Sequence, residues 1–189
     1  MLIRTMYALF VAALFIHLPA AGQETAGMTG FRAEFTGMFQ QEADKVLQLA
    51  GAIPEDKYSW RPQEGVRSIR EVYLHIAGAN VMFPAMISGE KIDFDAIMAQ
   101  EKKEVDKNEV KMQLTSSIEN IKKMVMNMTD ADLEKPVTIP FIPLTTTTRG
   151  VLMIIMSHMS EHLGQSIAYA RMVNVTPPWT AAQKESGGY

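Results

Sequence analysis

Three histidines carry the chemistry that is easiest to recognise in this sequence. His158 and His162 are four residues apart, so on a helix their side chains project from the same face, one turn apart. Two imidazoles in that arrangement can share one ion. His75 lies in a separate segment with helical periodicity, and it supplies a third nitrogen if the two segments pack together. Three imidazoles with one open position form the ligand set of catalytic zinc sites.

Histidine ligands narrow the identity of the metal but do not specify it. Imidazole binds nickel, copper and iron as well as zinc, so the residues predict a divalent ion such as zinc or nickel. The chain has no cysteine, which excludes thiolate ligands, a cysteine nucleophile and a disulfide framework. The structural alternative, three hydrogen-bonded core histidines, is not excluded by spacing.

Two further interpretations overlap the segment that holds His158. Residues 158–162 match H-x-x-E-H, the inverted zincin signature, in which Glu161 would be the general base. Proteases of that type take a further acidic ligand well downstream, and Glu185 is the sole acid after His162. The methionines at 153, 156 and 159 recur every three residues, which suits either a soft Cu(I) site or ordinary core filling.

The elements that must position the histidines follow from helical periodicity. Apolar residues recur at helical spacing over 29–50, 68–87, 108–128 and 149–173. Ser68 and Glu71 form a capping-box pattern at the start of the second segment. His75 lies on the second segment, while His158 and His162 lie on the fourth. Asn80 and Gln165 are polar residues near these faces and are candidates for contacts to the ligands or to substrate.

The connections between these segments are long. Residues 54–66 are predicted to be a loop, and 90–107 a charged connection with room for one helical turn. The run 101–111 mixes Lys and Glu and is interpreted as solvated surface. Residues 137–148 suit a short hairpin or an irregular loop, and 180–189 a frayed tail. The prediction is an all-α, antiparallel four-helix bundle whose long connections allow one to cross over.

The N-terminus predicts export. An apolar run over 6–18 follows Arg4 and precedes the small residues of PAAG at 19–22, the pattern of a secretory signal peptide. We therefore predict a signal peptide at 1–22, one domain at 23–189, and a secreted or periplasmic protein with no membrane span after cleavage. The net charge of −3, without a basic cluster, argues against nucleic acid as a partner.

Two short signatures resemble a known family. The first is YSWRP at 58–62 with EGVRSIREV at 64–72 and HIA at 75–77; the second is MSH at 156–158 with HLGQ at 162–165. Together they resemble the DinB-like superfamily, over about residues 31–172.

The resemblance implies a four-helix bundle, usually a homodimer, with His75, His158 and His162 as metal ligands. The family is similar to bacillithiol transferases and mycothiol-dependent maleylpyruvate isomerase, in which a metal activates a small thiol. The expected function is therefore a metal-dependent transferase or hydrolase acting on a thiol or another small molecule. Two alternatives remain: a metal-binding or sensing module without catalysis, and a bundle that serves only association.

Overall fold

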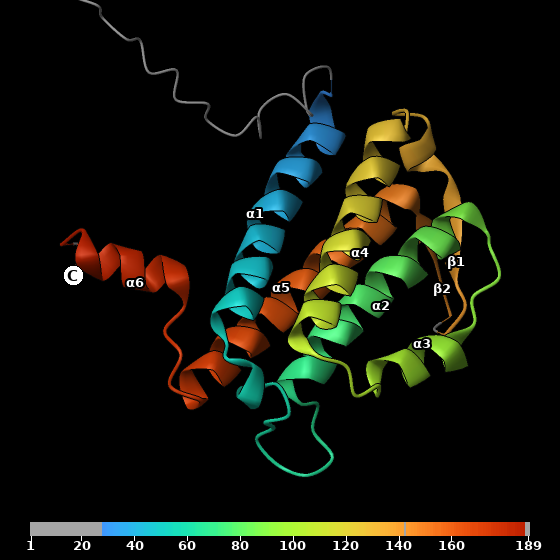
Figure 1. The fold of residues 1–189 in the computed structure, drawn as a ribbon. Coiled ribbons are helices and arrows are strands. Elements are labelled where there is room, and N and C mark those ends of the chain that lie inside the picture. Colours follow the sequence, from blue (N-terminus) through green and yellow to red (C-terminus); the bar gives the residue numbers. More distant parts are fainter. Residues whose placement is uncertain (1–27, 142, 188–189) are drawn as a thin grey trace, which may run out of the picture.

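The four predicted long helices are present and form a bundle (Figure 1). The computed structural model describes residues 28–141 and 143–187, so the predicted signal peptide lies outside the described residues. The long helices are α1 (Gly30–Ala52), α2 (Ile69–Ser88), α4 (Lys107–Asn127) and α5 (Thr148–Met172). Each begins and ends within a few residues of the predicted bounds.

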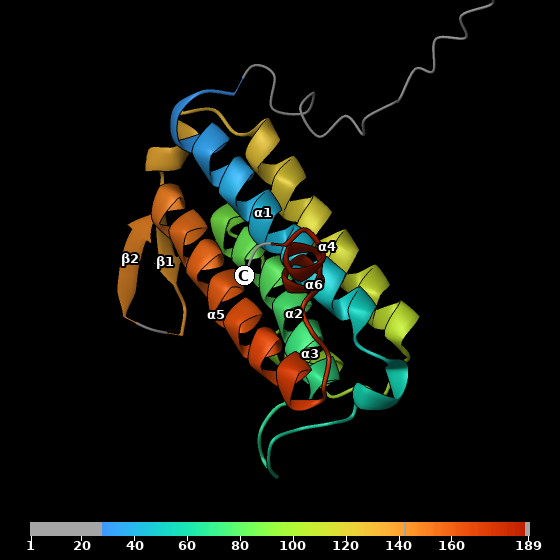
Figure 2. The ribbon, with the colours of Figure 1, turned by 90° about the vertical axis from the view of Figure 1, so that its left-hand side faces the viewer.

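The order of the helices around the bundle differs from a simple up-and-down arrangement. Helix α1 packs against α4 and α5, and α2 packs against the same two helices. Helices α1 and α2 are therefore diagonal partners, as are α4 and α5, whereas α2 and α4 lie side by side (Figure 2). The chain directions in Figure 1 make α1–α4 and α2–α5 antiparallel but α1–α5 and α2–α4 parallel. The long connections permit this, because they cross from one side of the bundle to the other.

Two short helices lie where none was fully predicted. Helix α3 (Phe94–Glu101) occupies the charged connection, and Asp93 caps it by accepting the amide of Ala96 at 2.9 Å. Helix α6 (Pro178–Glu185) lies in the segment predicted to be a frayed tail. Its proline at the first helical position has a backbone angle that suits helix entry. Two single turns of 3-10 helix, η1 (Glu55–Lys57) and η2 (Asp132–Glu134), are the remaining helical segments of the described residues.

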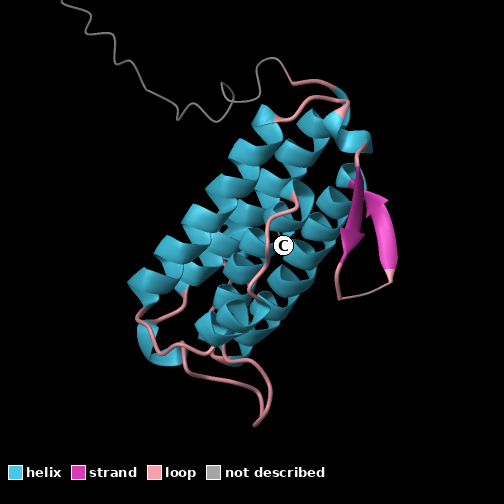
Figure 3. Ribbon diagram, turned by 90° about the vertical axis from the view of Figure 1, so that its right-hand side faces the viewer, coloured by secondary structure: helices cyan, strands magenta, loops and turns pink. Residues whose placement is uncertain are grey.

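The β-prone segment forms the hairpin rather than the irregular loop. Strands β1 (Pro136–Ile139) and β2 (Leu144–Thr147) pair antiparallel, with Val137 opposite Thr146. The hairpin stands beside the bundle, next to the start of α5 (Figure 3). Val137 and Ile139 are buried, so β1 is held to the bundle by its apolar face.

The core contains apolar side chains from all four long helices. Burial of this surface supplies the main favourable term in folding. The largest fully buried side chains are Tyr58, Tyr73, Phe39, Leu49, Ile53, Ile69, Leu74, Ile76, Leu114, Ile118, Ile121 and Ile139. Within the described residues, no helix has the length and apolarity that crossing a membrane requires.

The start of α2, two turns before His75, is fixed by the predicted capping box. The Ser68 hydroxyl accepts the amide of Glu71 at 3.2 Å, and the Glu71 carboxylate accepts the amide of Ser68 at 2.6 Å. Just before it, the Trp60 ring meets the Tyr169 ring of α5 edge to face at 5.3 Å. The loop is therefore tied both to α2 and to α5, the two helices that carry the histidines.

Candidate metal centre

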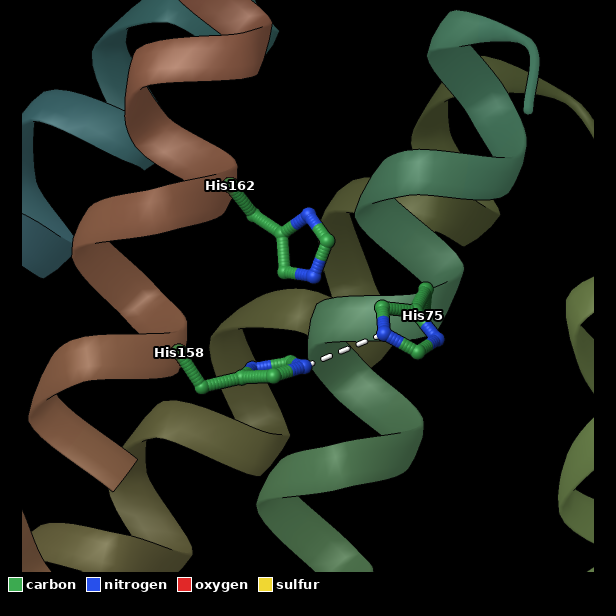
Figure 4. Close-up of side chains that lie close together, drawn as sticks. All are labelled: His75, His158 and His162. Atoms are coloured by element: carbon green, nitrogen blue, oxygen red, sulfur yellow. Dashed lines mark hydrogen bonds between the residues drawn. The ribbon is translucent and has the colours of Figure 1, made fainter. Parts of the chain in front are cut away.

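Helices α2 and α5 bring the three histidines together. His75 points from α2 toward His158 and His162 on α5 (Figure 4). One ligand nitrogen from each residue lies within 4.8 Å of the other two. The Nε2 atoms of His75 and His158 are 3.0 Å apart. Two nitrogens bound to one tetrahedral zinc ion at about 2.05 Å would be about 3.3 Å apart, so the spacing suits a shared ion.

A buried carboxylate orients the His75 ring. Glu101, at the end of α3, accepts a hydrogen bond from Nδ1 of His75 to its Oε2 at 2.9 Å. Arg67 grips the same carboxylate with two hydrogen bonds, of 2.7 Å to Oε1 and 3.3 Å to Oε2. With its proton held on Nδ1, His75 presents the lone pair of Nε2 to the centre. Carboxylate–histidine pairs of this kind orient ligands and raise their basicity in metal sites.

A second chain of hydrogen bonds orients the His162 ring. The amide oxygen of Gln165 accepts from Nδ1 of His162 at 2.8 Å. The amide nitrogen of Gln165 donates to the Tyr169 hydroxyl at 3.0 Å. Because Nδ1 donates, Nε2 of His162 keeps its lone pair, and Figure 4 shows this side of the ring turned toward the other two histidines.

The protonation states also favour metal binding. Burial lowers the pKa of His158 to about 3, with further contributions from His162, His75 and Arg67. Burial lowers the pKa of His75 as well, and Arg67 and His162 add to this effect, although Glu101 opposes it. Burial alone would raise the pKa of Glu101, but the hydrogen bond and charge of Arg67, followed by those of His75, hold it below its ordinary value. At neutral pH His75 and His158 are therefore neutral, and the Glu101 carboxylate is ionised.

These observations show that the donor set fits a divalent ion. The rings of His75 and His162 each donate from Nδ1 to an acceptor, and their Nε2 atoms face His158. Imidazoles oriented in this way suit zinc, nickel, copper or iron. Hydrogen bonding within the cluster would use only the contact of 3.0 Å between Nε2 of His158 and Nε2 of His75, and it would leave Nε2 of His162 without a partner among the described residues.

Two cavities are lined by the histidines or by their hydrogen-bond partners. One, of about 450 Å³, is lined by His75 and His158 and otherwise by apolar side chains of α2, α3, α5 and the hairpin segment. The other, of about 420 Å³, is lined by polar groups that include Arg67, Glu101, Lys102 and Gln165. Met98 of α3 contributes to both walls. The histidines therefore line an apolar pocket, while a second, more polar pocket is lined by Glu101 and Gln165, the hydrogen-bond partners of two of them.

The two overlapping interpretations of this segment find no support. Glu161 is exposed, and its carboxylate accepts from the Ser157 hydroxyl at 3.2 Å. Among the described residues its hydrogen bond is with Ser157, and it is not part of the group formed by the three histidines, so a zincin-type general base finds no support. Met159 is buried in the core while Met153 is 56% exposed. Methionines that differ so much in exposure do not converge on one soft site.

The interpretation of 101–111 as solvated surface is wrong for Glu101, which is only 3% exposed. Its role was detectable in principle. Phe94, Ile97, Met98 and Glu101 follow the i, i+3, i+4, i+7 spacing that places residues on one helix face. Asn80 was a candidate contact near the ligands, but its amide donates to the Ser117 hydroxyl at 3.2 Å and is buried against α4. Gln165, the other polar candidate, does contact a histidine.

We expect Gln165→Leu to weaken metal binding by about tenfold, the lower end of the range for losing a partner of a ligand. The variant removes the acceptor that fixes the His162 tautomer while keeping a side chain of similar size. Competition titration with a chromogenic zinc chelator measures the affinity. Tyr169→Phe is the matched control, since it removes only the hydroxyl beyond Gln165 and should change the affinity by less than threefold. Equal affinity in wild type and Gln165→Leu would contradict the proposed orientation of His162.

Comparisons with known proteins place this arrangement in a family. A sequence profile described as the DinB superfamily matches residues 38–166. That stretch includes α2, α3, α4 and all three histidines. No curated protein sequence matches the chain.

Solved structures show the same fold at low sequence identity. A DinB-like protein from Bacillus subtilis is 22% identical, with a TM-score of 0.60, over 76% of this chain and 94% of that one. A DinB-like protein from Bacillus cereus is 18% identical, with a TM-score of 0.61, over 76% and 93%. YfiT from Bacillus subtilis, described as a probable metal-dependent hydrolase with an unusual four-helix bundle topology, is 13% identical, with a TM-score of 0.63, over 79% and 93%.

These identities establish the fold of the bundle and no more, whereas the profile match covers most of the chain, with the histidine-bearing parts of α2 and α5 inside it. The chain belongs to the DinB superfamily.

Proposed function

We propose that this protein is a metal-dependent enzyme that acts on a small molecule at a three-histidine centre. The observation that carries the proposal is the position of the histidines at the wall of a cavity. His75 and His158 line the apolar pocket of about 450 Å³, and their Nε2 atoms face each other at 3.0 Å. A ligand in that pocket would therefore meet the centre directly.

Each side chain of the centre has a defined role in this proposal. His75, His158 and His162 would hold the ion, leaving one coordination position for an exogenous ligand. The ion would supply Lewis acidity, because three neutral donors leave its charge intact and lower the pKa of a water or thiol at that position. Glu101 and Gln165 keep two of the rings in the tautomer that binds metal.

Two reaction classes, hydrolysis and group transfer, are compatible with the proposed centre. Hydrolysis and group transfer both use a polarised ligand at an open position, and YfiT, which shares the fold, is described as a probable metal-dependent hydrolase. Hydrolase or transferase chemistry on a thiol or another small molecule is therefore the enzyme proposal.

We also propose that the protein is exported, on the strength of the apolar run at 6–18. This run and the small residues after it have the pattern of a cleaved secretory signal peptide. N-terminal sequencing of protein from its host should then begin after Gly22, and a mature chain that retains Arg4 would contradict export.

The alternative is a metal-binding module without catalysis. It would share the ligands but would have no coordination position that a small molecule can reach. The cavity beside His75 and His158 favours the enzyme. The two proposals therefore differ in what happens when a small ligand is added to the loaded protein.

Cobalt substitution separates the enzyme from the module. We expect cobalt-loaded protein to change its visible spectrum when azide or a small thiol is added, because either can take an open position. The variant His75→Ala should lose that spectral change, since one ligand is missing. Protein that carries one cobalt per chain and gives an unchanged spectrum with both additives has a closed site, and the enzyme proposal would then give way to the module.

A further inference from the structure

The apolar cavity beside the centre has a chemical character of its own. Apart from His75 and His158, its described lining consists of apolar side chains, with Phe83, Ile97 and Ile154 among them. Its volume of about 450 Å³ is within the range of small-molecule sites. It is also larger than the cavity of about 150 Å³ that accepts benzene in another protein. There is room for a sizeable apolar group.

The inner and outer walls of this cavity are both aromatic. Phe83 is buried, and its ring meets the His158 ring edge to face at 5.9 Å. Phe94 of α3 and Phe141 of the hairpin turn are 37% and 54% exposed, and their rings meet at 6.0 Å and 90°. Since these two are the exposed aromatic members of the lining, they form the rim. The pair joins two elements that are far apart in the sequence across the mouth of the pocket.

The charged side chains near the centre line a different cavity. Arg67, Glu101 and Lys102 line the polar cavity and do not line the apolar one. An ionised group in the part of the cavity away from His75 and His158 would lose its hydration without gaining a charged or hydrogen-bonding partner from the rest of the described lining, which is costly. The apolar cavity should therefore discriminate against charged groups that extend away from the centre.

We infer that the substrate of this centre has a neutral apolar body, aliphatic or aromatic, that fills the Phe83–Phe94–Phe141 pocket, and a polar reacting group that faces the histidines. The inference rests on the proposed function and specifies its substrate class. Phe94, Phe141 and Met98 act as specificity-determining residues at the rim and wall. Size and apolarity then decide which molecules present their reacting group to the centre.

A homologous series of metal-binding ligands tests the inference without turnover. The probes are acetohydroxamate, butyrohydroxamate, hexanohydroxamate and octanohydroxamate, titrated into cobalt-loaded protein while the visible spectrum is followed. Each added methylene that enters the cavity should tighten binding by about fourfold, from 0.8 kcal/mol per buried methylene. Suberic acid monohydroxamate, equally long but ending in a carboxylate, should lose most of that gain.

Matched variants assign the effect to this cavity. Met98→Gln, which makes the wall polar at nearly constant shape, should weaken octanohydroxamate at least fourfold and acetohydroxamate less than twofold. Met153→Gln is the control, because Met153 is similarly exposed on α5 but lies outside the cavity lining. Phe141→Ala, at an exposed position, gives a second variant whose fold should survive, and it should flatten the series for the longer ligands.

The outcomes distinguish the inference from the proposed function. Protein that binds no cobalt contradicts the proposed function, and the inference falls with it. Protein that binds cobalt and acetohydroxamate but shows equal affinity along the series overturns the inference alone. A rising series that Met98→Gln and Met153→Gln leave equally unchanged also overturns it, because the apolar chain would then lie elsewhere.

Discussion

Replacing His158 with alanine is expected to lower zinc affinity by at least 100-fold. Losing a partner of a ligand costs 10–100-fold in metal sites, and losing the ligand itself should cost at least as much. His158 and His75 have facing Nε2 atoms, so the variant removes a donor from the middle of the centre. Metal analysis after dialysis against a zinc buffer measures the loss. His162→Ala should behave in the same way.

The fold should survive both the substitution and removal of the metal. The core contains many apolar residues from four helices, and a chain of this length can bury its own core without a metal. Far-UV circular dichroism should therefore remain helical after chelation, while the melting temperature falls because a ligand of the native state has been removed. Ser160→Ala, exposed on the same helix, is the control. Full metal content in His158→Ala would show that the centre is wrongly assigned.

The second large effect is expected for Glu101→Ala, which should weaken zinc binding toward 100-fold, the upper end of the range for second-sphere partners. The loss is larger than for Gln165→Leu, because an ionised carboxylate forms the stronger hydrogen bond to an imidazole. The substitution also leaves Arg67 without its buried partner beside the centre. Glu101→Gln keeps an acceptor for His75 and should lose less. Glu104→Ala, a more exposed carboxylate three residues away that pairs with Arg70, should leave zinc affinity unchanged.

The contribution of Glu101 to the free energy of unfolding should depend on pH in a definite direction. Arg67 and His75 hold the pKa of Glu101 below the ordinary value of 4.5 despite its burial. A carboxylate with a lowered pKa stabilises the native state above its unfolded pKa, and the contribution is lost as the pH falls through the native value. The difference in unfolding free energy between wild type and Glu101→Gln should therefore be largest near pH 7 and shrink below about pH 4.5. Urea titrations at pH 7 and pH 3.5 measure it, and a difference that grows toward acid would contradict the ion-pair assignment.

The sequence predicted the helices well and their arrangement less well. Apolar periodicity over four long segments determines which residues form helices and which face is buried, so the bounds of α1, α2, α4 and α5 followed from it. Apolar periodicity does not predict which helices are neighbours around the core. The arrangement depends on the paths of the long connections, and their Pro-containing sequences do not predict those paths. The diagonal placement of α1 and α2 therefore emerged only from the structure.

The site shows the same division between local pattern and tertiary packing. The i, i+4 spacing of His158 and His162 predicted that they share a helix face, and a family resemblance added His75. Glu101 was assigned to solvated surface because its neighbours in sequence are charged. Its burial depends on α3 folding back onto α2 and on Arg67, which approaches from a loop 34 residues earlier. The mixed run of Lys and Glu does not by itself show which carboxylate is covered, whereas the spacing of Phe94, Ile97, Met98 and Glu101 places this one on the apolar face of α3.

The most direct test of the three-histidine centre is the X-ray absorption spectrum of zinc-loaded protein at the zinc edge. We expect three nitrogen ligands at about 2.0–2.1 Å with the outer-shell scattering of imidazole rings, and a fourth light atom from an exogenous ligand. His158→Ala, loaded at higher zinc concentration, should show fewer imidazoles. A shell made of oxygen alone, or one that contains sulfur from methionine, would contradict the centre.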